Sequence, residues 1–270
     1  MALKVGVQLY SVREYMEKDY VKTLTEIAKM GYDGVEFAGF CADPAEMGKL
    51  TRDLGMEVVS CHYPFPKMVE DPEKAFSDCL AAGCKYIVIP WLARDNELAD
   101  ENIDATIEKI KEIAALAKKA GLTMLYHNHD FEFDKIDGEY IIDKLYREVP
   151  ADLLQTQLDT CWVNVGGEDP ADFVRKYSGR APLVHLKDFT GTKSNNMYEL
   201  IGTDKAVADT SNNKFRLRPV GYGVQDMPKI IKASEDAGAD WIIVEQDNSD
   251  EMPLIECVKL ARDYLKSIGY

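Results

Sequence analysis

The sequence contains no stretch that could cross a membrane, because no run of apolar residues approaches the roughly 20 that a transmembrane helix needs. The chain starts directly with an apolar, strand-like segment and lacks the basic region and long apolar core of a secretory signal peptide. Low-complexity tracts and interdomain linkers are also missing. We therefore expect a cytoplasmic protein without a membrane partner, folded as one domain over residues 1–270.

The six cysteines are scattered and form no CxxC pair. This spacing indicates neither a zinc knuckle nor a disulfide framework. Several of them lie inside apolar runs, so we expect reduced and mostly buried thiols.

Basic residues are scarce, with 32 Lys and Arg against 47 Asp and Glu, which gives a net charge of −15. A nucleic-acid-binding protein needs a basic stripe that neutralises phosphates and releases counterions, and the sequence shows none. We therefore expect no nucleic-acid partner. An acidic surface of this kind mainly promotes solubility.

A short pattern recurs five times, as in KMGYDGVEF and KAGLTMLYHNH. A helix-like run stops at a glycine, and after one or a few mostly polar residues an apolar run ends on a polar or aromatic residue. Glycine suits the left-handed position just past a helix, so each instance predicts a helix-to-strand junction. The five glycines are Gly31, Gly55, Gly83, Gly121 and Gly238.

The whole chain is accordingly predicted as a series of strand and helix units. The predicted strands lie near 4–8, 33–37, 57–62, 85–90, 122–127, 154–159, 182–186 and 240–245. Strands separated by helices pair in parallel through right-handed crossovers, and eight such units can close on themselves. The length of 270 residues suits one (β/α)₈ TIM barrel, a fold of about 250 residues. The longest irregular stretch, about 189–219, is expected to be a lid or an oligomer contact.

Polar residues gather where the predicted strands end. In TIM barrels the active site lies at the C-terminal ends of the strands. All four histidines fall at or just past such an end, and two acidic residues do the same, which predicts one metal-centred active site. In chain order the strand-end residues are Gln8 and Tyr10, Glu36, His62, Trp91, His127 with Asn128 and His129, Gln157 and Asp159, His185 and Lys187, and Glu245.

Side chains of a strand alternate between its two faces, which tests this assignment. Gln157 shares a face with Asp159, and His185 shares a face with Lys187. If Asp159 points into the barrel, its strand has a polar inner face toward the mouth.

A shell of carboxylates and imidazoles suits a divalent ion such as Mn²⁺, Zn²⁺, Co²⁺ or Fe²⁺ better than Ca²⁺. Such an ion can bind two adjacent oxygens of a hydroxyketone and stabilise the enediolate that forms when the neighbouring C–H loses its proton. Glu245 can then act as the base, and Lys187 can balance the developing negative charge.

Several segments resemble the xylose-isomerase-like barrel superfamily of sugar phosphate isomerases and epimerases. They are VGVQLYSVR, GYDGVEF, SCHYPF, YHNHDFEF, QLDTCWV, PLVHLKDF, PVGYGV and IIVEQD, and the resemblance covers essentially the whole chain. It implies Asp159, His185 and Glu245 as ligands of one divalent cation, Mn, Zn, Co, Fe or Mg. Because barrels of this family frequently pair, a homodimer is compatible with the resemblance.

The fourth ligand is where the chain departs from this family. Relatives commonly carry Glu-Asn-His at the end of the fifth strand, whereas this chain has His127-Asn128-His129. We predict His127 as the fourth ligand, with His129 and Glu132 as the alternatives. The predicted catalytic residues are Glu245, His127 and Lys187. The predicted substrate-binding residues are Gln8, Glu36, His62, Trp91 and His129.

Three classes of function remain, each with a small sugar or sugar derivative as the partner. The leading one is an isomerase or epimerase that acts on a sugar or sugar phosphate through a metal-bound enediolate. The alternative is a lyase or dehydratase that acts on a keto-sugar, a keto-inositol or an oxidised glycoside. A non-catalytic binding protein is disfavoured because the carboxylates and histidine are intact. The charge also disfavours a DNA endonuclease.

Overall fold

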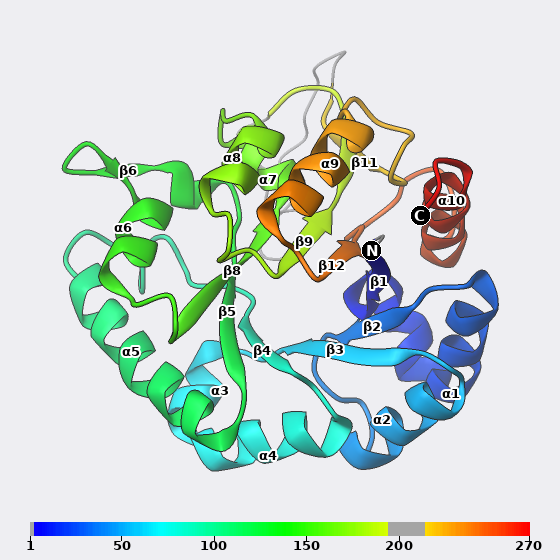
Figure 1. The fold of residues 1–270 in the computed structure, drawn as a ribbon, viewed down its shortest axis with the longest axis horizontal. Coiled ribbons are helices and arrows are strands. Elements are labelled where there is room, and N and C mark those ends of the chain that lie inside the picture. Colours follow the sequence, from blue (N-terminus) through cyan, green and yellow to red (C-terminus); the bar gives the residue numbers. More distant parts are fainter. Residues whose placement is uncertain (1–2, 194–213) are drawn as a thin grey trace.

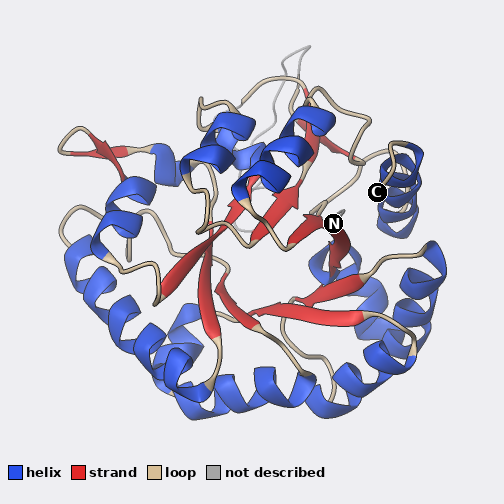
Figure 2. Ribbon diagram, viewed as in Figure 1, coloured by secondary structure: helices blue, strands red, loops and turns tan. Residues whose placement is uncertain are grey.

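A computed structural model describes residues 3–193 and 214–270 (Figure 1). Eight parallel strands close into a barrel in the order β1, β12, β9, β8, β5, β4, β3 and β2, and helices surround it (Figure 2). The predicted TIM barrel is therefore confirmed. The barrel strands are β1 (Lys4–Gln8), β2 (Gly34–Phe37), β3 (Glu57–His62), β4 (Tyr86–Ile89), β5 (Thr123–His127), β8 (Leu154–Asp159), β9 (Leu183–Leu186) and β12 (Trp241–Val244).

The long helix α5 (Ile103–Ala120) buries one apolar face. In α5, residues spaced by three or four, such as Ile103, Ile107 and Ile110, are buried, as the sequence periodicity predicts. The α-helices are α1 (Arg13–Met30), α2 (Pro44–Asp53), α3 (Phe65–Glu70), α4 (Pro72–Ala82), α5 (Ile103–Ala120), α6 (Ile141–Glu148), α7 (Thr160–Val165), α8 (Pro170–Lys176), α9 (Met227–Ala237) and α10 (Leu254–Ser267). Two 3₁₀ turns, η1 (Leu9–Val12) and η2 (Phe131–Phe133), follow β1 and β5.

The five glycines predicted at helix-to-strand junctions all have left-handed backbones, with φ between 79° and 96°. A side chain there would strain the backbone, so glycine lets each helix stop and the chain turn into the next strand. This local feature sets the regular spacing of the units.

The stretch predicted as irregular between 189 and 219 is partly regular, which corrects the prediction. Its ends form a two-stranded antiparallel ribbon of β10 (Asp188–Thr190) and β11 (Arg216–Arg218). Phe189 and Leu217 of this ribbon pack with Trp162 in one buried cluster, a contact that the turn-rich composition does not reveal. The remainder, 194–213, where a lid or oligomer contact was expected, lies outside the described residues. A second short ribbon joins β6 (Lys135–Ile136) and β7 (Glu139–Tyr140).

The inside of the barrel changes from apolar to ionic along the strands. Near the strand starts, a separate apolar cluster includes Leu183 and Trp241. A Cβ atom on Gly34 would come within 2.8 Å of the Trp241 ring, so glycine makes room for the indole. Two and four residues further along the chain, Leu183 is followed by the buried His185 and Lys187. The same face of one chain segment therefore supplies both regions.

Among the described residues, no helix is long and apolar enough to cross a membrane. All six cysteines are unpaired, and all except Cys41 are buried, as predicted.

Candidate metal and active site

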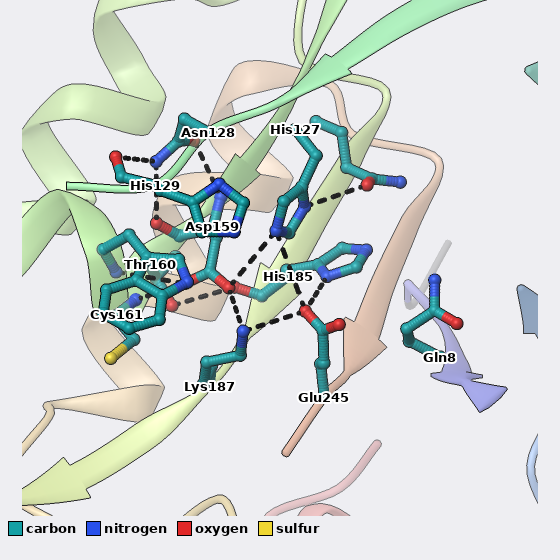
Figure 3. Close-up of polar contacts among 12 residues, drawn as sticks. Gln8, His127, Asn128, His129, Asp159, Thr160, Cys161, His185, Lys187 and Glu245 are labelled. Carbon is teal, nitrogen blue, oxygen red and sulfur yellow. Dashed lines mark hydrogen bonds and ion pairs between the residues drawn. The ribbon is translucent and has the colours of Figure 1, made fainter. Parts of the chain in front are cut away.

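Four side chains from four strand ends converge at the mouth of the barrel (Figure 3). His127 ends β5, Asp159 ends β8, His185 lies in β9 and Glu245 directly follows β12. One nitrogen or carboxylate oxygen of each lies within 4.8 Å of the others, and all four residues are buried. The structure thus brings together the four residues predicted as ligands, and this donor set fits one divalent cation.

Asp159 is held in place by the turn that follows it. Its Oδ1 atom accepts hydrogen bonds from the backbone N–H groups of Cys161 (2.9 Å) and Trp162 (3.1 Å), so the residue caps the N-terminus of α7. Asn128 accepts the backbone N–H of Asp159 through Oδ1 at 3.0 Å. With Oδ1 engaged, Oδ2 is the oxygen left for the centre of the site.

Lys187 is the buried cation of the site, with only 1% of its surface exposed. Its Nζ atom lies 3.0 Å from Asp159 Oδ2, 3.1 Å from Glu245 Oε2 and 3.0 Å from Asp247 Oδ2. Burial alone would lower the pKa of Lys187, but the three carboxylates hold it well above its usual range. Lys187 therefore stays charged.

Sequence reasoning missed Asp247. It lies two residues after Glu245, and both side chains reach Lys187. The same alternation that pairs His185 with Lys187 would have pointed to it. Burial raises the pKa of the Asp247 carboxyl to about 6, although the nearby ammonium of Lys187 opposes the shift.

His185 lies between two carboxylates. Its Nδ1 atom is 2.8 Å from Glu245 Oε2, and its Nε2 atom is 2.8 Å from Glu36 Oε1, although off the line of a good hydrogen bond. Burial alone would lower the pKa of His185, yet the charges of Glu36 and Glu245 raise it to about 10. A metal ion bound through His185 would have to displace this proton.

Glu36 is the centre of a buried polar network behind the site. Its carboxylate accepts hydrogen bonds from Gln8 Nε2 (2.7 Å), Ser60 Oγ (2.5 Å) and Gln157 Nε2 (2.5 Å). His62 Nε2 is 3.1 Å from it. Burial would raise the pKa of Glu36, but the neighbouring histidines hold it well below its usual range. The network orients two imidazole rings at once.

His127 differs from His185 because its neighbouring carboxylates lie beyond hydrogen-bonding distance. Its Nδ1 atom lies 3.1 Å from Gln157 Oε1, while Nε2 is 3.8 Å from Asp159 Oδ2 and 3.9 Å from Glu245 Oε2. Burial lowers the pKa of His127 well below its usual range, so the ring is neutral. A neutral imidazole with Nε2 facing two carboxylates is suited to coordination.

The two alternatives for the fourth ligand lie outside this group. Glu132 accepts hydrogen bonds from the Tyr126 hydroxyl and from the backbone N–H of His129, the latter at 2.8 Å. Burial raises the pKa of Glu132 to about 8. The His129 ring packs against Trp91, with ring centres 4.6 Å apart, and against Phe131, with centres 5.5 Å apart.

A cavity of about 180 Å³ opens onto two of the converging side chains, His127 and Glu245. His62, Trp91 and His129, three of the five predicted substrate-binding residues, lie on its wall. Gln8 and Glu36 are fully buried and do not line it, so their contribution is better described as orienting the network. The complete lining is Tyr10, His62, Pro90, Trp91, His127, His129, Lys187, Glu245 and Asp247.

Comparison with known proteins identifies one family. The xylose isomerase-like TIM barrel family matches residues 24–268. An inosose dehydratase of Clostridium perfringens is 28% identical over 93% of this chain and 90% of its own length. An inosose dehydratase of Geobacillus kaustophilus is 24% identical over 90% of this chain and 85% of its own length.

Solved structures show the same fold at lower sequence identity. A sugar phosphate isomerase/epimerase from Parabacteroides distasonis has a TM-score of 0.78 at 22% identity, covering 100% of this chain and 95% of that one. The IOLI protein with a bound zinc atom has a TM-score of 0.73 at 14% identity, with 98% of each chain covered.

Proposed function

This chain belongs to the xylose isomerase-like TIM barrel family, and we propose that it is a metal-dependent carbon–oxygen lyase acting on a cyclic hydroxyketone. The observation that carries the proposal is the convergence of two imidazoles, two carboxylates and a buried ammonium at the mouth of the barrel. Of these groups, His127, Glu245 and Lys187 lie on the cavity wall. The similarity to inosose dehydratases along nearly the whole chain favours elimination over isomerisation.

The proposed metal ligands are His127, Asp159, His185 and Glu245. Their mixed nitrogen and oxygen donors suit Mn²⁺, Zn²⁺, Co²⁺ or Fe²⁺. When bound, such an ion polarises a carbonyl and stabilises negative charge that develops on its oxygen. The proposal does not depend on which of these ions is loaded.

Glu245 is the proposed base. Burial would raise its pKa, but the charges of Lys187 and His185 hold it well below its usual range, so the carboxylate is ionised at neutral pH. It lies on the cavity wall, where it can accept the proton from the carbon next to the substrate carbonyl.

Lys187 is proposed to stabilise the departing oxygen. Its ammonium lies on the same wall, within 3.1 Å of both Glu245 and Asp247. After the proton leaves, the electron pair of the C–H bond forms a carbon–carbon double bond and the β C–O bond breaks. The oxygen that leaves takes up the proton that Glu245 accepted and departs as water. A buried cation beside it favours this step, since low solvent access strengthens its attraction to negative charge.

An isomerase or epimerase, the leading expectation from the sequence, is the second candidate. It would use the same base but return the proton to the substrate instead of expelling an oxygen. The fold shared with a sugar phosphate isomerase/epimerase is compatible with this chemistry. We place it second because the inosose dehydratases are more similar in sequence.

The test begins with metal analysis of the purified protein, followed by reloading with Mn²⁺. The loaded protein is incubated with an inosose in D₂O and followed by NMR. We expect one ion per chain, deuterium uptake next to the carbonyl and loss of water. Deuterium uptake with an isomeric product and without water loss would instead establish the second candidate. A metal-loaded protein that exchanges no proton would contradict both.

A further inference from the structure

A second cavity, of about 520 Å³, adjoins the first at the mouth of the barrel. Its wall is formed where η1 and α1 meet the segments that follow β2 and β3. Tyr10, His62 and Pro90 line both cavities. The larger cavity is therefore an extension of the proposed active site.

The sizes of the two cavities suggest that they bind different parts of the substrate. Pockets that enclose a drug-sized ligand usually measure about 300–1,000 Å³, so the cavity of about 180 Å³ beside the proposed metal ligands suits a single ring. The larger cavity lies inside that range. A substrate that consists of one ring would leave the larger cavity empty.

The inner wall of the larger cavity is apolar. Met16, Phe37 and Met47 are buried beneath it, and Phe40 is half-buried with its ring centre 5.3 Å from that of Phe37. Aromatic and thioether side chains pack well against the flat face of a ring. An uncharged ring would bury this surface from water.

The charged residues at this cavity are a poor site for a phosphate. Nη1 of Arg13 donates to the backbone carbonyls of Tyr10 and Asp247, both at 2.9 Å, and the guanidinium lies 4.2 Å from the Tyr10 ring centre. These contacts hold η1 against the segment after β12 and occupy the guanidinium of Arg13. Lys67 shares the lining with Glu17, an opposite charge.

We propose that the reacting ring of the substrate carries a second uncharged ring, joined through the oxygen that leaves, and that this second ring occupies the larger cavity. The inference rests on the proposed function and names its substrate class. Tyr10, at the junction of the cavities, lines the smaller cavity together with Lys187 and Asp247. The bond that breaks would therefore pass beside the ammonium assigned to the departing oxygen.

The reaction balances without an oxidant. Glu245 takes the proton next to the carbonyl, the electron pair forms the carbon–carbon double bond, and the bond from the β carbon to the bridging oxygen breaks. The bridging oxygen takes the proton that Glu245 removed, and the second ring departs as an alcohol. This elimination differs from the loss of water only in its leaving group.

The test compares two substrates of the Mn²⁺-loaded protein: an inosose and a 3-keto-glycoside with a 4-nitrophenyl aglycone. Ala38 is exposed and lines only the larger cavity, so Ala38→Phe should fill that space. We expect the aryl glycoside to have the higher kcat/KM. The ratio of its kcat/KM to that of the inosose should fall about tenfold or more in Ala38→Phe. Phe40→Ala removes part of the apolar wall of the larger cavity instead of filling the cavity. It should lower the same ratio.

Leu80→Ala is the control, because Leu80 is an exposed apolar residue on α4 that lines neither cavity. It should leave the ratio unchanged. Turnover of the inosose without turnover of the aryl glycoside, or an unchanged ratio in both cavity variants, would overturn the inference and leave the proposed function standing. Turnover of neither substrate, without proton exchange, would overturn both.

Discussion

The interior of the barrel has two halves of opposite chemistry. The apolar half, near the strand starts, is the cluster of Val59, Tyr86, Val88, Leu125, Leu183, Trp241 and Ile243. The ionic half, near the strand ends, holds Glu36, Asp159, His185, Lys187 and Glu245, all buried. The same chain segments supply both halves: β5 contributes Leu125 and then His127, and β9 contributes Leu183 and then His185.

The two halves should contribute differently to stability. Each apolar side chain buried in the first half stabilises the fold by roughly 1.5–3 kcal/mol. Buried charges cost desolvation energy, which their mutual attraction often only offsets. The ionic half therefore depends on a barrel that its apolar half and the outer helices stabilise, and its charges are better explained by chemistry than by folding.

The largest effect expected in the ionic half is on proton transfer. Glu245→Gln should lower deuterium exchange into the substrate by about 10²–10⁴-fold, because an amide cannot accept the proton at neutral pH. Some metal should remain bound, since the amide oxygen can still coordinate. Exchange rate and metal content are measured together, with Glu256→Gln on the exposed face of α10 as the control. Unchanged exchange in a metal-loaded variant would refute the assignment.

In the apolar half the expected effect is on stability. Leu125→Ala should reduce the free energy of unfolding by about 2–5 kcal/mol, because it leaves a cavity in a packed interior. Leu116→Ala, on α5 with 42% of its surface exposed, should stay within about 0.5 kcal/mol of the parent. Urea unfolding measures both. If Leu125→Ala is no less stable than Leu116→Ala, the two halves do not differ as described.

His127 and His129 are expected to have different roles at the ionic half. His127 should coordinate the metal, and His129 should contact the substrate. His127→Ala should weaken metal retention by a factor of about ten or more, whereas His129→Ala should mainly lower turnover. The structure motivates this difference because only His127 belongs to the converging group. Metal content and kcat of both variants decide it. Metal loss in the His129 variant alone would reverse the roles, and loss in neither would return the fourth ligand to Glu132.

The last prediction concerns the pH dependence of stability and Glu132, which is buried just outside the ionic half. Its pKa of about 8 in the folded protein exceeds the ordinary value of 4.5, because burial disfavours the charge. The proton is therefore held more tightly in the folded state, and the stability it contributes is complete below pH 4.5 and lost as the pH rises through 8.

Glu132→Gln cannot ionise, so the stability of the parent relative to this variant should fall between about pH 4.5 and pH 8. Urea midpoints at pH 5, 7 and 9 measure the difference. A constant difference across this range would show that Glu132 does not titrate as described.

Much of the fold followed from local sequence features. The left-handed glycines, such as Gly31 and Gly121, mark where helices stop, and this depends on the backbone of one residue alone. The alternation of His185 with Lys187 and of Gln157 with Asp159 depends only on the two-residue period of a strand. These local rules, with the rule that barrel sites lie at strand ends, placed the four proposed ligands at one mouth.

The sequence by itself thus determined the barrel, its eight strands and the end where the polar residues meet. Only the tertiary structure decided that Glu132 turns to Tyr126, that Asp247 joins Lys187, and that a larger cavity opens beside Tyr10. It also decided the pairing of β10 with β11. The physical reason is the distance along the chain over which each feature is set. Turns and alternation are properties of neighbouring residues. These contacts instead depend on how the closed barrel and its helices place segments that are distant in the chain.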